Sequence, residues 1–165
     1  MLTRRAALSV AIRGLAAIEG ASLLQIPTAQ STEEDHVVRT DAEWRKLLTP
    51  QQYAILRKEG TEPPFTSPLL HEERRGTFAC AGCQLDLFSS ATKFDSGTGW
   101  PSFWAPLDNA VVTKEDRSFF MTRTAVMCRR CDGHLGHVFD DGPKPTGLRY
   151  CMNGLALTFK PAVSA

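Results

Sequence analysis

Four of the five cysteines occur as two Cys-x-x-Cys pairs, Cys80–Cys83 and Cys128–Cys131, separated by 44 residues. Two residues between thiolates allow a tight turn to point both sulfurs at one cation, and two such turns complete a tetrahedral zinc site. A closed four-sulfur site has no open position for water or substrate, so this metal would stabilise the fold. The spacing therefore predicts one structural zinc ion.

Two other interpretations of these four cysteines remain open. If the chain is exported, they could form two disulfides; if it is not, one pair could be a redox dithiol. We favour zinc because two paired knuckles are a metal signature, whereas a single Cys-x-x-Cys pair is a weaker one. The two pairs could be a duplicated zinc knuckle, and we expect Gly82 and Gly133 to supply the backbone freedom of the two turns.

The fifth cysteine, Cys151, has no such partner and is either inert packing or a nucleophile. On a strand through residues 149–153, Arg149, Cys151 and Asn153 would share one face, since side chains alternate. A guanidinium favours the thiolate form and an amide supplies hydrogen bonds. We therefore predict that Cys151 is a nucleophile.

Two histidines, His134 and His137, lie within four residues in a glycine-containing stretch between the second cysteine pair and Cys151. Each alone is more often structural than catalytic. Their crowding beside a lone thiol favours a proton donor, and the cysteines already satisfy a zinc ion without them.

The segment 94–104 is a glycine-rich turn that carries four aromatic residues. Most of them are expected to fill the core. An indole such as that of Trp100 can also form the wall of an apolar pocket for a small neutral substrate.

These residues must be positioned by short elements. Residues 41–60 predict two short helices, the first capped by Asp41 and the second opened by Thr49-Pro50 and stopped by Gly60. From Gly76 onward, short alternating or aromatic runs broken by Gly, Pro, Asp and Ser predict antiparallel strands. The residues expected to face the core from the helices are Trp44, Leu47, Leu48, Tyr53, Ile55 and Leu56.

The length of 165 residues suits one domain plus an appendage. With 19 Lys+Arg against 18 Asp+Glu, the chain has no strong field to collect phosphates, so nucleic acid is not expected as a partner. Residues 1–30 open with Arg4-Arg5 and are rich in Ala and Leu, which resembles a twin-arginine export signal. Arg13 and Glu19 interrupt this stretch, so a cytoplasmic helix is the alternative, and no uncharged run there could span a bilayer.

Beyond these features, the chain resembles the B-type methionine-R-sulfoxide reductases from about Trp44 to Phe159. Several motifs in the same order carry the resemblance: GTEPPF (60–65), CAGC (80–83), FDSGTGWPSF (94–103), CRRC (128–131), GHLGHVFDDGP (133–143) and RYCMNG (149–154). The resemblance implies a mainly β fold, two antiparallel sheets in a zinc-stapled β-tent with short N-terminal helices. Composition along the chain places the domain at residues 41–162, after a possible leader at 1–30 and a polar, charged linker at 31–40.

The resemblance also implies roles for single residues and partners. Cys151 would attack the sulfoxide sulfur of methionine R-sulfoxide in oxidised proteins or peptides and become a sulfenic acid. Thioredoxin or another external thiol would then reduce it, and the enzyme would be a monomer, periplasmic if exported. The supporting roles are these: His134 and His137 bind the sulfoxide and donate the proton, Asp141, Arg149 and Asn153 form a polar network, and Trp100 and Phe139 receive the substrate.

Two positions depart from the family pattern. Many relatives carry a resolving cysteine where this chain has Thr98, so no second thiol would remain to close an internal disulfide. Relatives often place an acidic residue where this chain has Ala125. Rival readings are a non-catalytic zinc-binding module and a disulfide exchange enzyme; the first leaves Cys151 and both histidines unexplained.

Overall fold

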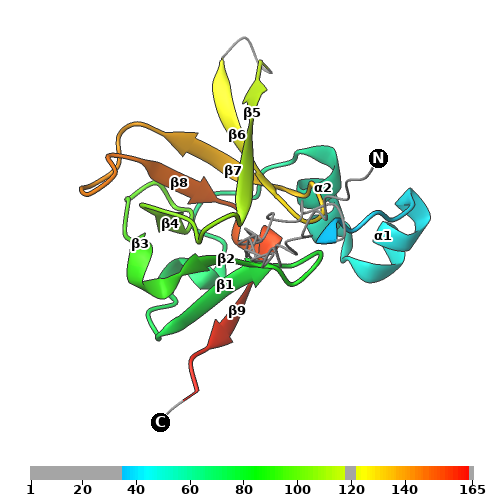
Figure 1. The fold of residues 1–165 in the computed structure, drawn as a ribbon, viewed down its shortest axis with the longest axis horizontal. Helices are drawn as coiled ribbons and strands as arrows, with labels where there is room; N and C mark the ends of the chain where they lie inside the picture. Colours follow the sequence, from blue (N-terminus) through cyan, green and yellow to red (C-terminus); the bar gives the residue numbers. More distant parts are fainter. Residues whose placement is uncertain (1–34, 118–121, 164–165) are drawn as a thin grey trace, which may run out of the picture. The chain divides into compact units, whose positions relative to one another are not determined.

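The computed structural model of this protein describes residues 35–117 and 122–163 (Figure 1). This part of the chain forms two antiparallel sheets and two short helices, which confirms the mainly β fold expected from the sequence. The expected leader, residues 1–30, lies outside the described residues, as do residues 31–34 of the expected linker.

Two capping boxes define the helices α1 (Asp41–Leu47) and α2 (Pro50–Lys58). The expectation that Asp41 caps the first helix was wrong by one position. The hydroxyl of Thr40 accepts from the N–H of Glu43, and the Glu43 carboxylate accepts from the N–H of Thr40, so Thr40 satisfies the free donors of the first turn. Asp41 instead accepts hydrogen bonds from Arg45 and Tyr53.

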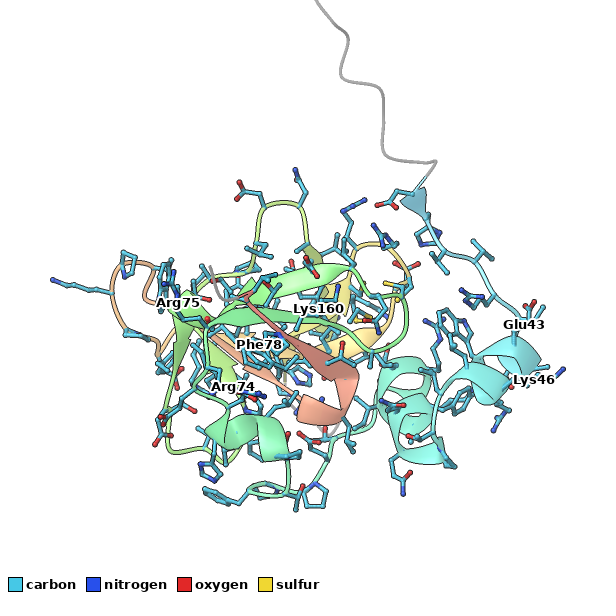
Figure 2. The ribbon with its side chains drawn as sticks, turned by 90° about the horizontal axis from the view of Figure 1, so that it is seen from below. Glu43, Lys46, Arg74, Arg75, Phe78 and Lys160 are labelled. Carbon is cyan, nitrogen blue, oxygen red and sulfur yellow. The ribbon has the colours of Figure 1, made fainter. Side chains whose placement is uncertain are left out.

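The helices bury one face each, with the core residues Trp44, Leu48, Tyr53, Ile55 and Leu56. Leu47 was expected to join them but is 52% exposed, because Trp44 and Leu48, four residues apart, occupy the buried side of α1. Figure 2 shows Glu43 and Lys46 on the solvent side of the same helix. Among residues 35–117 and 122–163, no helix has the length and hydrophobicity needed to cross a bilayer.

The smaller sheet has three strands in the order β2-β1-β9. The central strand β1 (Gly76–Cys80) pairs with both neighbours, β2 (Asp86–Ser89) and β9 (Leu157–Pro161). The sheet therefore joins the first cysteine pair to the C-terminal end of the domain.

The larger sheet has six strands in the order β3-β4-β8-β7-β6-β5. Its strands are β3 (Lys93–Phe94), β4 (Ser102–Phe103), β5 (Val111–Asp116), β6 (Arg123–Cys128), β7 (His134–Phe139) and β8 (Arg149–Met152). The strands that carry Cys151 and the two histidines, β8 and β7, lie side by side in its middle (Figure 1). Short 3-10 helices lie between these elements along the chain, at Pro68–His71, Ser90–Thr92 and Gly154–Ala156.

Aromatic rings from both sheets pack together. Phe78 of β1 and Phe88 of β2 lie 5.0 Å and 4.4 Å from the ring of Phe103 in β4, and all three are fully buried. Figure 2 shows Phe78 among the side chains that surround the smaller sheet. Each such pair contributes about 0.5–1.5 kcal/mol beyond area burial, so this cluster fixes one sheet against the other.

Candidate functional site

The four paired cysteines converge on one point. Their sulfur atoms all lie within 4.8 Å of one another, with Sγ–Sγ distances of 3.7 Å between Cys80 and Cys131 and 3.5 Å between Cys83 and Cys128. A tetrahedron with zinc–sulfur bonds of about 2.3 Å has sulfur–sulfur edges of about 3.8 Å. All four thiols are free of disulfides. The cluster therefore has the donor set and the dimensions of a structural zinc site, as the spacing predicted.

The four thiols shift one another's pKa values because they lie in contact. Contacts with Cys128 and burial raise the pKa of the Cys80 thiol, whereas contacts with Cys128 lower the pKa of the Cys83 thiol. Zinc would hold all four as thiolates.

Both cysteine pairs have the same backbone geometry. The residue after each pair, Gln84 or Asp132, has a left-handed backbone, with φ of 62° and 53°. Its N–H donates to the carbonyl of the first cysteine, at 2.8 Å from Gln84 to Cys80 and at 2.9 Å from Asp132 to Cys128. The two turns are thus equivalent, as a duplicated knuckle would be.

The expected role of the two glycines in these turns was wrong, because Gln84 and Asp132 take the left-handed positions. Gly133 matters for packing instead: a Cβ there would approach Leu56 Cδ2 to 2.9 Å. A Cβ at Gly82 would meet only ordinary contacts. One turn follows β1 and the other follows β6, so a bound metal joins the smaller sheet to the larger one.

Cys151 lies in the middle of β8, half buried, with Ser102 of β4 and His137 of β7 as its direct neighbours across the sheet. Its side chain opens into a cavity of about 160 Å³ that the predicted residues Trp100, His137, Phe139 and Asn153 also line. The remaining lining residues are Thr61, Arg123 and Gly136. The fold therefore brings the lone thiol, one imidazole and an indole to one small, partly apolar space.

His137 is held by a carboxylate that the sequence did not predict. Its Nε2 lies 2.9 Å from Oδ2 of Asp116, which also accepts from Nη2 of Arg123 at 2.7 Å. The side chains of Asp116 and His137 are only 15% and 12% exposed. Ala125 pairs directly with His137 across β6 and β7, so the carboxylate reaches the imidazole from the next strand, β5.

His134 lies behind His137 and does not line the cavity; the two ring centroids are 5.2 Å apart. It is 1% exposed, and burial together with the neighbouring His137 lowers its pKa to about 4. Neither of its ring nitrogens has a hydrogen-bond partner among the described residues. His134 is therefore neutral at pH 7, and its predicted part in proton donation stays a prediction.

Arg149 makes a two-pronged ion pair with Asp141, at 2.8 Å for both bonds. Its guanidinium also stacks 4.3 Å from the ring centroid of Phe139. The pKa of Arg149 is raised first by Asp141 and also by the neighbouring Cys151 thiol, while Arg149 lowers the pKa of Asp141. This arrangement holds a fixed positive charge near the thiol, as the predicted polar network requires.

Asn153 follows β8 rather than continuing it, yet its side chain reaches the same cavity. Its Oδ1 accepts from the N–H of Glu62 at 3.0 Å, and its Nδ2 donates to the carbonyl of Leu135 at 3.1 Å. Glu62 connects several residues of this region through hydrogen bonds, and the sequence did not predict this role.

Glu62 is 4% exposed, and burial raises its pKa. Its carboxylate accepts from the N–H groups of Gly154 and Leu155, and its carbonyl accepts from the indole Nε1 of Trp100 at 3.0 Å. One residue thus fixes both Trp100 and Asn153. The sequence did contain an indication of this role, because Glu62 lies inside the GTEPPF motif.

Thr98 contacts the thiol directly: its Oγ1 lies 3.7 Å from Cys151 Sγ. Ser96 Oγ lies 2.8 Å from the Thr98 hydroxyl and 2.7 Å from Ser102 Oγ. The position that carries a resolving cysteine in many relatives therefore touches Cys151, and here it holds a hydroxyl.

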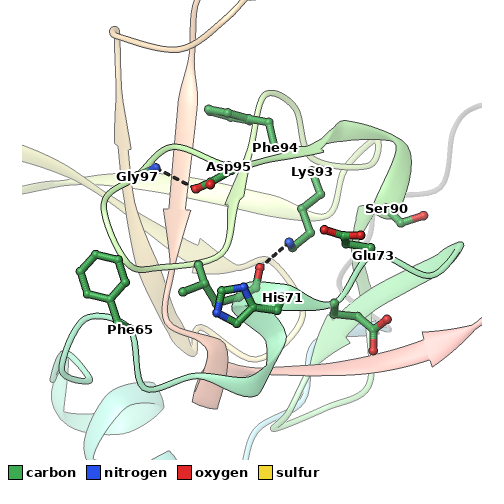
Figure 3. Close-up of a pocket in the computed structure, with 10 residues that line it drawn as sticks. Phe65, His71, Glu73, Ser90, Lys93, Phe94, Asp95 and Gly97 are labelled. Atoms are coloured by element: carbon green, nitrogen blue, oxygen red, sulfur yellow. Dashed lines mark hydrogen bonds between the residues drawn. The ribbon is translucent and has the colours of Figure 1, made fainter.

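A second cavity, of about 360 Å³, contains neither Cys151 nor the histidine pair (Figure 3). Lys93 Nζ, half buried in it, donates to the carbonyl of Leu70 at 2.8 Å, and desolvation lowers its pKa. Asp95 caps the loop by accepting from the N–H of Gly97 at 2.9 Å. These contacts stabilise the loop that leads to Thr98.

Comparison with known sequences agrees with this geometry. The SelR domain matches residues 48–161. The chain is 56% identical over 124 residues to the peptide methionine sulfoxide reductase MsrB of Pseudomonas putida (strain W619), covering 74% of this chain and 93% of that protein. It is 54% identical over 125 residues to the MsrB of Methanosarcina barkeri (strain Fusaro / DSM 804), covering 75% and 88%, and 51% identical over 138 residues to that of Bradyrhizobium diazoefficiens, covering 82% and 99%. The chain therefore belongs to the SelR domain family, as a member of the MsrB group of peptide methionine sulfoxide reductases.

Proposed function

We propose that this protein reduces methionine R-sulfoxide in oxidised proteins or peptides to methionine and so repairs oxidative damage. The observation that carries the proposal is the position of Cys151: of five cysteines it alone stands outside the four-sulfur cluster, and it opens into the cavity lined by His137 and Trp100. A non-catalytic zinc module would need the cluster but not this cavity.

The chemical step uses groups that lie at the site. The Cys151 thiolate attacks the sulfoxide sulfur, and the His137 imidazolium gives a proton to the sulfoxide oxygen. The S–O bond of the substrate breaks, the hydroxyl passes to the Cys151 sulfur, and methionine leaves. The substrate sulfur is reduced by two electrons and Cys151 is oxidised to the sulfenic acid. Trp100 and Phe139 would receive the apolar part of the side chain, and Arg149 would place a positive charge near the attacking sulfur.

The sulfenic acid is then reduced from outside the chain. Thr98 occupies the contact position beside Cys151, and the other four cysteines belong to the cluster. An external thiol such as thioredoxin would form a mixed disulfide with Cys151 and release water, and a second thiol would free Cys151.

The test is a single-turnover experiment with each sulfoxide epimer and no reductant. One methionine per protein is expected from the R epimer, together with a mass increase of one oxygen on the Cys151 peptide, trapped by a sulfenic-acid reagent. The Cys151→Ser variant should form no methionine while keeping its zinc. Methionine formation by that variant, or an internal disulfide in the wild type, would contradict the proposal.

The compartment is a separate part of the proposal. The Arg4-Arg5 pair and the Ala- and Leu-rich stretch support export to the periplasm by a twin-arginine route, in which the folded, metal-loaded protein would cross the membrane. Sequencing of the mature N-terminus tests this. A start near Ser31 is expected, whereas an intact Met1 would favour the cytoplasm.

A further inference from the structure

The acidic side chain of Asp116 comes from β5, two strands from β7, the strand that carries the imidazole of His137. We infer that Asp116 is a positioning residue for His137: it holds the ring through Nε2–H, so that Nδ1 is the nitrogen that gives the proton to the sulfoxide oxygen. The inference rests on the proposed function, because it names how the proton donor of that reaction is oriented.

The hydrogen-bond chemistry of the pair fixes the proton. An ionised carboxylate only accepts hydrogen bonds, so a bond from His137 Nε2 to Asp116 Oδ2 at 2.9 Å requires the hydrogen on Nε2. In the neutral ring the hydrogen is then on Nε2, and Nδ1 is bare. The second proton of the imidazolium is on Nδ1, and its transfer to the substrate returns the ring to the same tautomer.

The surroundings make this contact strong. Asp116 and His137 are both largely shielded from solvent, and Arg123 keeps a positive charge 2.7 Å from the same carboxylate oxygen. A charge-assisted hydrogen bond of this kind is stronger than one between neutral groups. The contact therefore restricts both the rotation of the ring and the choice of tautomer.

Among residues 35–117 and 122–163, the charged and titratable groups near His137 come from four strands. They are Asp116 on β5, Arg123 on β6, His134 on its own strand β7, and Cys151 on β8. His134 carries no charge at neutral pH because its pKa is about 4. Within the described part of the chain, Asp116 is thus the acidic group in direct contact with the ring.

The sheet register explains how Asp116 comes to do this. Asp116 pairs with Arg123, two residues before Ala125, and Ala125 pairs with His137. The small side chain at Ala125 leaves the diagonal path from β5 to β7 open. The departure from the family pattern at Ala125 is therefore compatible with a carboxylate on His137.

The experiment measures the tautomer without substrate and the reaction with it. Zinc-loaded protein with ¹⁵N-labelled histidine is studied by NMR, and His137 is assigned by its loss in His137→Asn. The neutral His137 ring of the wild type should carry its hydrogen on Nε2. Asp116→Ala should populate both tautomers and slow sulfenic acid formation in a single turnover by roughly 10- to 100-fold. Asp116→Glu should restore most of the rate.

A matched control is Asp86→Ala, which removes an exposed carboxylate paired with Lys160 and should change neither readout. Asp116→Asn removes the charge but keeps the size, and its amide no longer requires the hydrogen on Nε2, so it should also populate both tautomers and slow the single turnover. This variant also serves if Asp116→Ala does not fold.

A wild-type hydrogen on Nδ1 would overturn the inference, as would an unchanged tautomer and rate in both Asp116→Ala and Asp116→Asn. Failure of the proposed function has a different signature, namely that the wild type forms no methionine, and the tautomer measurement does not depend on it.

Discussion

The two sulfur centres of this protein differ in the partners that surround each thiol. In the cluster, four thiols face one another within 4.8 Å, and both pairs follow the same backbone turn. At Cys151, a single thiol faces a hydroxyl, an imidazole and an open cavity. Thiolates that bind one metal ion together stabilise the fold, whereas a thiol kept apart from them is free to act as a nucleophile.

Removal of the metal should have the largest effect. It takes the ion from the four-cysteine cluster, and the unfolding that follows should also inactivate the Cys151 site. Structural zinc supplies about 10–16 kcal/mol in small zinc peptides, which is comparable to the usual stability of a whole domain, about 5–15 kcal/mol. A strong chelator at neutral pH should therefore unfold the domain and abolish activity together, as measured by circular dichroism and zinc release. Full activity after complete zinc loss would contradict the claim that the four-cysteine cluster stabilises the fold on which Cys151 depends.

Acidification should weaken the fold through His134, which is buried beside His137. Its folded-state pKa of about 4 is below the unfolded value of about 6.5, so the unfolded chain binds the proton first. The stabilisation is complete above about pH 6.5 and is lost as the pH falls toward 4; between pH 7 and 5 the loss is about 2 kcal/mol.

Urea unfolding of the wild type and His134→Gln at both pH values measures this loss. The variant should show a smaller decrease in the free energy of unfolding, whereas His71→Gln, at an exposed histidine, should behave like the wild type. Equal pH dependence in His134→Gln and wild type would contradict the shift.

Glu62→Gln should separate the two centres, because the Glu62 carboxylate anchors the backbone whose carbonyl and N–H hold Trp100 and Asn153, at a distance from the four-cysteine cluster. The amide cannot accept from both Gly154 and Leu155 as the carboxylate does, so we expect a loss of about 1.5 kcal/mol. Thermal unfolding and steady-state kinetics should show a lower melting temperature and lower kcat/KM with one zinc still bound. An exposed carboxylate, Glu115→Gln, is the control.

Thr98→Cys should have the smallest effect on stability, below about 1 kcal/mol, but should change the product of the first turnover. A thiol at this position would lie against Cys151, since the present hydroxyl is 3.7 Å from its sulfur. Mass spectrometry after one turnover should find an internal disulfide in the variant and a sulfenic acid in the wild type. A persistent sulfenic acid in Thr98→Cys would mean that the two side chains cannot close.

The parts of the molecule that could be predicted from sequence are those with local signals. The cysteine spacing gave the cluster, the Thr-Pro pair gave the start of α2, and alternation placed Arg149 and Cys151 on one strand. Each depends on residues close together in the chain.

The parts that could not be predicted depend on pairing between distant strands. Asp116 reaches His137 only because β5, β6 and β7 are neighbours in a particular register, and alternation alone does not give that register. Leu47 was placed wrongly in the core because Trp44 and Leu48 occupy the buried side of this short helix and leave Leu47 exposed. The indole of Trp100 was predicted, but its support by Glu62 joins residues 38 positions apart.

The central claim, that the two sulfur centres have separate tasks, is tested most directly by measuring zinc content and single-turnover methionine formation side by side in Cys151→Ser and Cys128→Ser. Cys151→Ser should keep one zinc and the wild-type melting temperature and form no methionine. Cys128→Ser should lose zinc and the folded state. Loss of zinc in Cys151→Ser, or methionine formation by it, would contradict the account.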